Sequence, residues 1–320
     1  ASLGGFAVLA TKRSEARART AAGPDVGRVG EVMPVPVEPR DPVDDLLLLD
    51  PVELEVGYAL IPLVDESQGG DLLARVGALR RQAAQELGLL VPPVRIRDDI
   101  DLAPGAYIVR VRGSEVARGE IMARKVLALD TGSVTEEVEG VSVRDPSFGL
   151  PARWIDQGNK VEAEARGWAV AEPGAVVATH LMETLKAHGS ELLGRQDVQV
   201  MLDRLAKTHP ALIEEVVPAR LSLGVVHRVL QRLLRERVPI RDMVSILESL
   251  ADHADATKDP EVLTEHVRRS LSKVIAEPYM NATGAIRGIT VGPRIEAALM
   301  GLFSPRAESV DSLSPDRLSS

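Results

Sequence analysis

The sequence predicts an α+β protein of several subdomains, in which α/β subdomains flank a helical subdomain and a flexible linker comes first. Three observations carry this prediction. Alternating apolar and polar residues in 51–123 predict strands around one amphipathic helix. Apolar residues recur at helical spacing through most of 176–276. Residues 11–50 contain several prolines and glycines, and their apolar residues follow no steady period.

The first predicted elements are a strand, a helix, a strand and a hairpin. Residues 52–56 alternate apolar and acidic residues, as a half-buried strand does. Leucine, valine and alanine then recur at helical spacing over 72–87, and Gly88 stands where a helix commonly ends. A second strand is expected at 94–97, and 107–121 reads as a hairpin that turns at a Gly-Ser pair.

The pattern of apolar and polar residues changes after residue 124. Short strand-like runs at 126–129 and 168–170 enclose a region rich in glycine, proline and aspartate, with one helix expected at 157–166. Periodic apolar residues, interrupted by prolines, then predict five helices, at 176–188, 195–208, 221–236, 241–254 and 260–276. After Pro278 the sequence predicts one strand at 285–291 and one helix at 293–303.

The start of the chain allows more than one interpretation. Residues 1–10 are apolar and are followed by Lys12 and Arg13, so they read as the end of a transmembrane helix with its positive flank. A frayed terminus is the alternative, and the remainder of a signal peptide is less favoured because its positive charge should precede the apolar run. Residues 11–50 are expected to be a flexible linker.

Composition excludes several classes of protein. The 320 residues are 45% hydrophobic and 27% charged, which excludes a wholly disordered or collagen-like chain. The net charge of −9 argues against a nucleic-acid partner. Because the chain has no cysteine, it can form no disulfide and no thiolate metal site.

A search for catalytic patterns finds none. The six histidines lack the spacing of a zinc site, and no phosphate-binding glycine loop or nucleophile elbow is present. The run Asp98, Asp99 and Asp101 is better explained as a solvated loop than as a cation site, because the glycine turn of a calcium loop is missing. The sequence therefore predicts no metal, no cofactor and no enzymatic activity.

The most unusual local sequence is RDPSFGLP at 144–151. Two prolines and Gly149 constrain the backbone around Phe148. The residues alone favour a loop that buries Phe148 in its own core, and the competing interpretation is an exposed apolar anchor for a partner with Asp145 as a charged contact at its rim.

At this sequence the chain resembles the cytoplasmic region of bacterial flagellar export-gate proteins of the FHIPEP family. The resemblance covers roughly residues 50–302. It rests on several long blocks in the right order: GYALIPLVDESQGGDLLARVGALRRQAAQELG (57–88), VPPVRIRDDIDLAPGAYIVRVRG (91–113), DPSFGLPARWI (145–155), THLMETL (179–185), ELLGRQ (191–196) and IRDMVSILE (240–248).

The resemblance implies a division into subdomains. The parts are a first α+β subdomain of 51–123 with 173–192, an inserted α/β subdomain of 124–172, a helical subdomain of 193–272, and a truncated last α/β subdomain and tail of 273–320.

The resemblance also implies a function in protein export. It implies a homo-nonameric ring at the bacterial inner membrane that docks export chaperones carrying filament-type substrates and contacts other export-apparatus proteins. The family's docking residues correspond here to Asp145, Phe148 and Thr179, with Pro146 and Gly149 as neighbours. Because all three residue types are present, the resemblance favours Phe148 as an exposed anchor.

Three alternatives are kept beside this interpretation. The injectisome export gate belongs to the same family, and its chaperones would differ. A hydrolase that uses the acidic run at 98–101 predicts bound metal or turnover. A purely structural ring predicts that Phe148→Ala leaves chaperone binding unchanged but costs stability.

Overall fold

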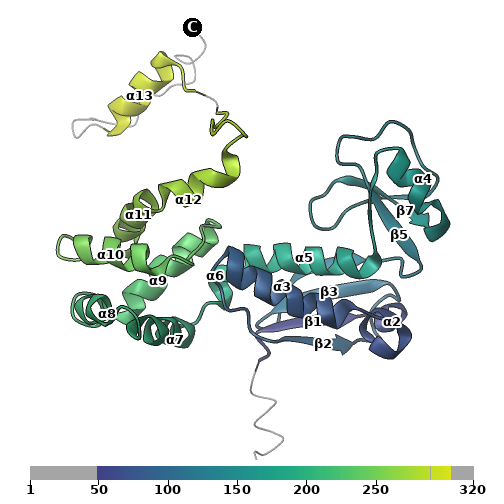
Figure 1. Cartoon of the computed structure of the whole chain (residues 1–320), viewed down its shortest axis with the longest axis horizontal. Coiled ribbons are helices and arrows are strands. Elements are labelled where there is room, and N and C mark those ends of the chain that lie inside the picture. Colours follow the sequence, from purple (N-terminus) through teal and green to yellow (C-terminus); the bar gives the residue numbers. More distant parts are fainter. Residues whose placement is uncertain (1–48, 289, 304–320) are drawn as a thin grey trace, which may run out of the picture. The chain divides into compact units, whose positions relative to one another are not determined.

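The computed structural model describes residues 49–288 and 290–303 (Figure 1). The expectations for 1–10 and for all but the last two residues of 11–50 lie outside the described residues. Two four-stranded sheets and many helices confirm the predicted α+β class.

The first sheet has the order β2-β1-β3-β4. Its strands are β1 (Val52–Val56), β2 (Val94–Asp98), β3 (Ala106–Val111) and β4 (Ser114–Glu120). β1 and β2 are parallel, as expected for strands joined through a crossover helix, whereas β3 and β4 form the predicted hairpin. Arg112 and Gly113 turn this hairpin, and both have positive φ, of 50° and 80°, which matches the right-handed twist of the strands.

Helices α3 (Leu72–Glu86) and α5 (Pro173–Ala187) pack against each other over this sheet (Figure 1). Short helical turns precede α3: η1 (Tyr58–Leu60), α2 (Ile61–Val64) and η2 (Glu66–Gln68). The apolar periodicity of α3 buries Leu72, Val76, Leu79 and Ala83. Leu73, which shares the apolar pattern, is 45% exposed, so the predicted buried face was one residue too wide.

Gly88 ends α3 in the left-handed region, with φ of +73°. A Cβ at this position would lie 2.5 Å from the backbone nitrogen of Arg241, so the chain preceding α10 (Met243–His253) crosses here without space for a side chain. The nitrogen of Ile240 donates to the carbonyl oxygen of Leu87 at 2.8 Å and fixes this crossing.

Gly88→Ala is expected to lower the free energy of unfolding by about 2 kcal/mol or more, because it combines left-handed strain with a backbone clash. Gly77→Ala is the matched control within the same helix. A Cβ there meets only the Arg81 guanidinium at 3.9 Å, so alanine should stabilise the protein by roughly 0.5–1 kcal/mol. Urea unfolding of the two variants measures both values, and equal effects would contradict the close crossing at Gly88.

The second sheet is antiparallel, with the order β6-β7-β5-β8. Its strands are β5 (Lys125–Leu129), β6 (Val141–Arg144), β7 (Pro151–Asp156) and β8 (Ala169–Ala171). Both of its faces are covered. On one face, Val126 and Ile155 form a small core with Trp168 under the helix α4 (Lys160–Ala165). On the other face, Leu127 and Trp154 join the main core. The short turn η3 (Gln157–Asn159) precedes α4.

Among the remaining helices, α9 (Leu223–Arg235) has a buried apolar face and packs against three others, α6 (Gly189–Leu192), α7 (Arg195–Ala206) and α11 (Pro260–Ser270). This part of the chain also contains α8 (Pro210–Val216), α10 and α12 (Ser272–Ala276). The sequence did not predict α8, because Pro210 was interpreted as a break. In the structure Pro210 lies in the first turn of α8, where a missing backbone N–H costs nothing.

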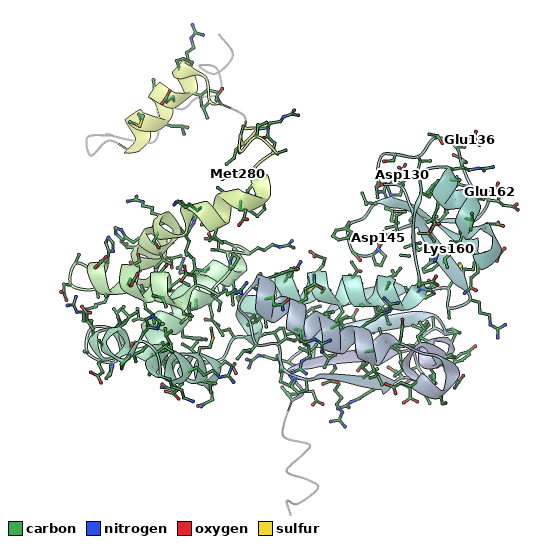
Figure 2. The ribbon with its side chains drawn as sticks, viewed as in Figure 1. Asp130, Glu136, Asp145, Lys160, Glu162 and Met280 are labelled. Atoms are coloured by element: carbon green, nitrogen blue, oxygen red, sulfur yellow. The ribbon has the colours of Figure 1, made fainter. Side chains whose placement is uncertain are left out.

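The last described segment contains η4 (Glu277–Tyr279) and α13 (Pro293–Phe303), and this helix agrees with the prediction. The strand predicted at 285–291 is wrong. Among its described residues only Ile286 is paired, through a single antiparallel bridge to Met280 (labelled in Figure 2), and a strand needs a continuous neighbour. Within 49–288 and 290–303, no helix combines the length and the hydrophobicity that crossing a membrane requires. The subdomain boundaries implied by the resemblance stay a prediction.

Candidate functional site

The loop between β6 and β7 is a compact turn closed by its own backbone. The nitrogen of Asp145 donates to the carbonyl oxygen of Leu150, and the nitrogen of Gly149 donates to the carbonyl oxygen of Asp145, both at 2.9 Å. Gly149 has φ of +68°, a conformation that glycine adopts at little cost. Phe148 therefore stands on a loop whose backbone is held on both sides.

Asp145 braces this loop through its side chain (labelled in Figure 2). Its Oδ2 accepts hydrogen bonds from the backbone nitrogens of Phe148, at 2.7 Å, and of Ser147, at 3.2 Å. Aspartate commonly bonds the backbone two or three residues ahead in this way. The carboxylate is only 4% exposed, so it lies under the loop.

Phe148 itself is 58% exposed. This contradicts the interpretation from residues alone, in which the ring fills its own core. The side chain of Arg144 adds a further support, because its Nη1 donates to the carbonyl oxygen of Gly149 at 2.9 Å. An apolar ring in water on a rigid loop is the arrangement expected of an anchor that loses little freedom on binding.

Thr179, the third residue implied by the resemblance, is exposed on α5. This helix contacts β4 of the first sheet and β5 of the second. Asp145 and Phe148 thus share the braced loop of the second sheet, Thr179 lies on the helix that contacts this sheet at β5, and their part in docking stays a prediction.

A buried tyrosine–histidine pair lies between these elements. Tyr107 on β3 is fully buried, and its hydroxyl lies 2.7 Å from Nδ1 of His180. The two rings meet edge to face, with centroids 5.7 Å apart and an interplanar angle of 77°. Burial and the charge of Asp145 both raise the pKa of Tyr107, so its hydroxyl keeps its proton at neutral pH.

A cavity of about 340 Å³ adjoins the braced loop. One side is the first sheet, at Arg118, Gly119 and Glu120 of β4, and the other is the face of the second sheet that carries Leu127 and Trp154. Asp145 and Pro146 complete the lining together with Val143 and Arg144. The loop that carries Phe148 therefore borders a hollow between the two sheets.

Sequence reasoning missed three residues near this site: Tyr107, His180 and Trp154. Tyr107 and His180 are 73 positions apart, and no local pattern connects them. Trp154 could have been found, because apolar residues on both faces of 152–155 indicate a strand buried on both sides.

The acidic run begins at the last residue of β2, Asp98, and continues into a loop. Asp98 is exposed, and Oδ1 of Asp99 accepts a hydrogen bond from the backbone nitrogen of Asp101 at 2.8 Å. No group of three or more His, Asp or Glu side chains that could hold a metal ion occurs among the residues the structure describes.

His180 makes stability depend on pH in a defined direction. Burial lowers its pKa below the ordinary value of about 6.5, and the charge of Asp145 opposes this shift. The unfolded chain therefore binds more protons in this range, so the contribution of His180 is present above pH 6.5 and is lost as pH falls through the lowered pKa.

We expect the wild type to lose more stability than His180→Gln between pH 7 and pH 5. The difference should be a fraction of the ~1.4 kcal/mol per pH unit that a full proton would give, because solvent reaches part of the imidazole. Urea unfolding at several pH values measures it. Parallel curves for the two proteins would contradict the lowered pKa.

The fold described above defines a structural class, the cytosolic domains of type III export-gate proteins. The structure of Chlamydia pneumoniae CdsV superposes with a TM-score of 0.70 at 27% identity and covers 84% of this chain and 79% of that one. The nonameric EscV cytosolic domain from the type III secretion system matches in fold, with a TM-score of 0.62 at 20% identity over 84% of this chain and 78% of that one.

The chain belongs to the FHIPEP family, which it matches over residues 2–320, and the resemblance seen in the sequence is thereby confirmed. It is 43% identical over 275 residues to the flagellar biosynthesis protein FlhA of Bacillus subtilis (strain 168), which covers 86% of this chain and 41% of that protein. It is 41% identical over 257 residues to FlhA of Escherichia coli (strain K12), covering 80% of this chain and 37% of that protein. The chain spans about two fifths of the length of these relatives.

Proposed function

We propose that this chain is the cytoplasmic ring part of a flagellar type III export gate. In this proposal it docks export chaperones bound to filament-type substrates and passes the substrates toward the membrane channel. Family membership and the FlhA relatives support the export-gate role. The chain has no enzymatic activity in this proposal and acts by binding alone.

The observation that carries the docking role is the exposed Phe148 ring on its braced loop. A ring that is 58% exposed while the aspartate beneath it is 4% exposed is held outward by the fold. Burying such a ring against a partner contributes about 1.5–3 kcal/mol, which suits a docking step that must also release. A helix of the chaperone with an apolar face fits this anchor, with Thr179 at the edge of the contact and with Asp145 bracing the loop from beneath.

The proposal extends to a ring and to attachment at the membrane. The EscV cytosolic domain, whose fold matches, is a nonamer, and we extend that assembly to this chain. We place the chain at the cytoplasmic side of the inner membrane, attached through parts of the longer FlhA-type protein. The complex of CdsV with CdsO supports the proposal that another export-apparatus protein binds the ring.

A flagellar gate is favoured over an injectisome gate by sequence identity. The chain is 43% identical to the B. subtilis flagellar protein and 20% identical to EscV. Binding of both flagellar and injectisome chaperone–substrate pairs tests the choice, since only the flagellar pair should bind.

Phe148→Ala is expected to weaken docking by about 10- to 100-fold, since each 1.4 kcal/mol is a factor of ten. The measurement is calorimetric titration of the chain with a cognate flagellar chaperone–substrate complex. Val161→Ala is the matched control, because Val161 is 76% exposed on α4 of the same region and should leave the affinity unchanged.

The melting temperature of Phe148→Ala should stay that of the wild type, because an exposed ring stabilises the fold little. Undiminished binding by Phe148→Ala would end the docking proposal at this site. A large fall in its melting temperature would mean that the ring has a structural role.

A further inference from the structure

Tyr107 is held in a slot that leaves its ring no alternative position. The side chain is fully buried, and a Cβ added at Gly119 on the neighbouring strand would overlap the ring and its hydroxyl. β3 and β4 pair Tyr107 directly with Gly119, so the glycine provides the space that the ring fills. The hydroxyl therefore stands at a fixed point at the edge of the first sheet.

The hydroxyl in turn fixes His180. The Tyr107 hydroxyl and Nδ1 of His180 share a hydrogen bond of 2.7 Å, in which the hydroxyl donates when the imidazole proton is on Nε2 and accepts when that proton is on Nδ1. Thr179 precedes His180 on α5, so a fixed His180 side chain also holds the helical turn that contains Thr179. This turn is reinforced by Thr184, whose Oγ1 donates to the carbonyl oxygen of His180 at 2.7 Å.

Asp145 connects the pair to the loop that carries Phe148. It lines one cavity together with Gly119, the glycine against which the Tyr107 ring packs. The Asp145 carboxylate accepts the backbone N–H of Phe148. The Tyr107 ring and the braced loop therefore border the same hollow between the two sheets.

We infer that Tyr107 and His180 are positioning residues for docking, and that they hold the Asp145-braced loop and the Thr179 turn of α5 in the arrangement that a partner recognises. The inference rests on the proposed function for what is recognised. The positioning itself belongs to the free protein, so it can be measured without a partner.

The variants separate a hydrogen bond from the packing around it. Tyr107→Phe removes only the hydroxyl and keeps the ring beside Gly119. His180→Leu removes the hydrogen-bond partner of this hydroxyl, whereas His180→Gln keeps a side-chain oxygen that can accept from Tyr107. We expect Tyr107→Phe and His180→Leu each to weaken partner binding about five- to tenfold at 25 °C, and His180→Gln to retain most of the affinity.

A double variant tests whether the two residues act as one unit. Tyr107→Phe combined with His180→Leu should bind about as weakly as either single variant, because each already breaks the same contact. If the affinity losses of the two single variants multiply in the double variant, the inference is overturned. Wild-type affinity in Tyr107→Phe would also overturn it.

The readout in the free protein is fluorine NMR of a chain labelled with fluorophenylalanine. The chain has three phenylalanines and each Tyr→Phe variant adds a fourth, so the Phe148 signal is assigned in every protein as the one that disappears when Phe148→Leu is added. We expect Tyr107→Phe to shift or split the Phe148 signal. Tyr58→Phe is the control and should leave the signal unchanged, because Tyr58 is exposed, in η1. A merely structural role for Tyr107 would lower the melting temperature without changing the signal.

The two proposals fail in different ways. An unchanged Phe148 signal in Tyr107→Phe overturns the positioning role, whatever the partner does. A changed signal together with equal binding by wild type and Phe148→Ala removes the docking function and leaves the positioning of the loop intact.

Discussion

Asp145→Ala is expected to weaken docking of the chaperone–substrate complex by about tenfold or more. The alanine leaves the backbone N–H groups of Ser147 and Phe148 without their acceptor, and hydrogen bonds to a charged group contribute about 1.5–3 kcal/mol. Once the loop populates other conformations, the apparent affinity is the intrinsic affinity multiplied by the fraction of molecules whose loop can still bind the partner.

Asp145→Asn is the matched variant that separates bracing from charge. The asparagine oxygen can still accept the N–H of Phe148, but the negative charge is gone. If the carboxylate acts by bracing the loop, the asparagine variant should lose only about two- to threefold in affinity, a small fraction of the alanine effect. Calorimetric titration of both variants measures this. Equal, large losses would mean that the partner contacts the charge of Asp145 directly, as a rim residue would.

Leu230→Ala is expected to lower the free energy of unfolding by about 2–5 kcal/mol, the range for removing a fully buried leucine from a packed core. Leu230 is 0% exposed at the centre of α9, beside Val226 and Leu233 on the same buried face. This helix contacts α6, α7 and α11, so the cavity left by the truncated side chain has no flexible border that could collapse into it.

Leu73→Ala is the control for this prediction. Leu73 has the same side chain within α3 but is 45% exposed, so its truncation should change stability by roughly 0.5 kcal/mol or less. Urea unfolding of both variants gives the comparison. A loss below about 1 kcal/mol in Leu230→Ala would contradict a core centred on α9.

Local periodicity predicted the elements whose burial is one-sided. The amphipathic helices α3, α9 and α10 repeat their apolar residues in a way that the sequence displays directly. Their ends could be read from single residues, such as Gly88 after α3 and Asp259 before α11.

The second sheet was harder to predict for a physical reason. β7 buries Trp154 against one core and Ile155 against another, so it lacks the alternation that identifies a half-exposed strand. Its first residue is Pro151, which suggested a loop, although a proline is tolerated at the start of a strand. The strands β6 and β7 were therefore hidden in what read as one irregular sequence.

In the candidate site too, local features could be predicted from the sequence and contacts between distant residues could not. The spacing of Asp145 and Phe148, three residues apart with a proline between them, is a local pattern from which the brace could have been read. The contact between Tyr107 and His180 joins β3 to α5 and exists only once the fold is formed. Whether Phe148 points into the core or into water also depends on the fold, and the residues alone favoured the wrong answer.

The most direct test of the central claim is photocrosslinking from position 148. A photoreactive benzoylphenylalanine replaces Phe148 and keeps an aromatic ring on the braced loop. A second protein carries it in place of Val161, which is more open to solvent, at 76% against 58%. With the cognate chaperone–substrate complex present, we predict a crosslinked product from position 148 that is absent from position 161. Binding that persists without any crosslink from position 148, or equal crosslinking from both positions, would contradict Phe148 as the docking anchor.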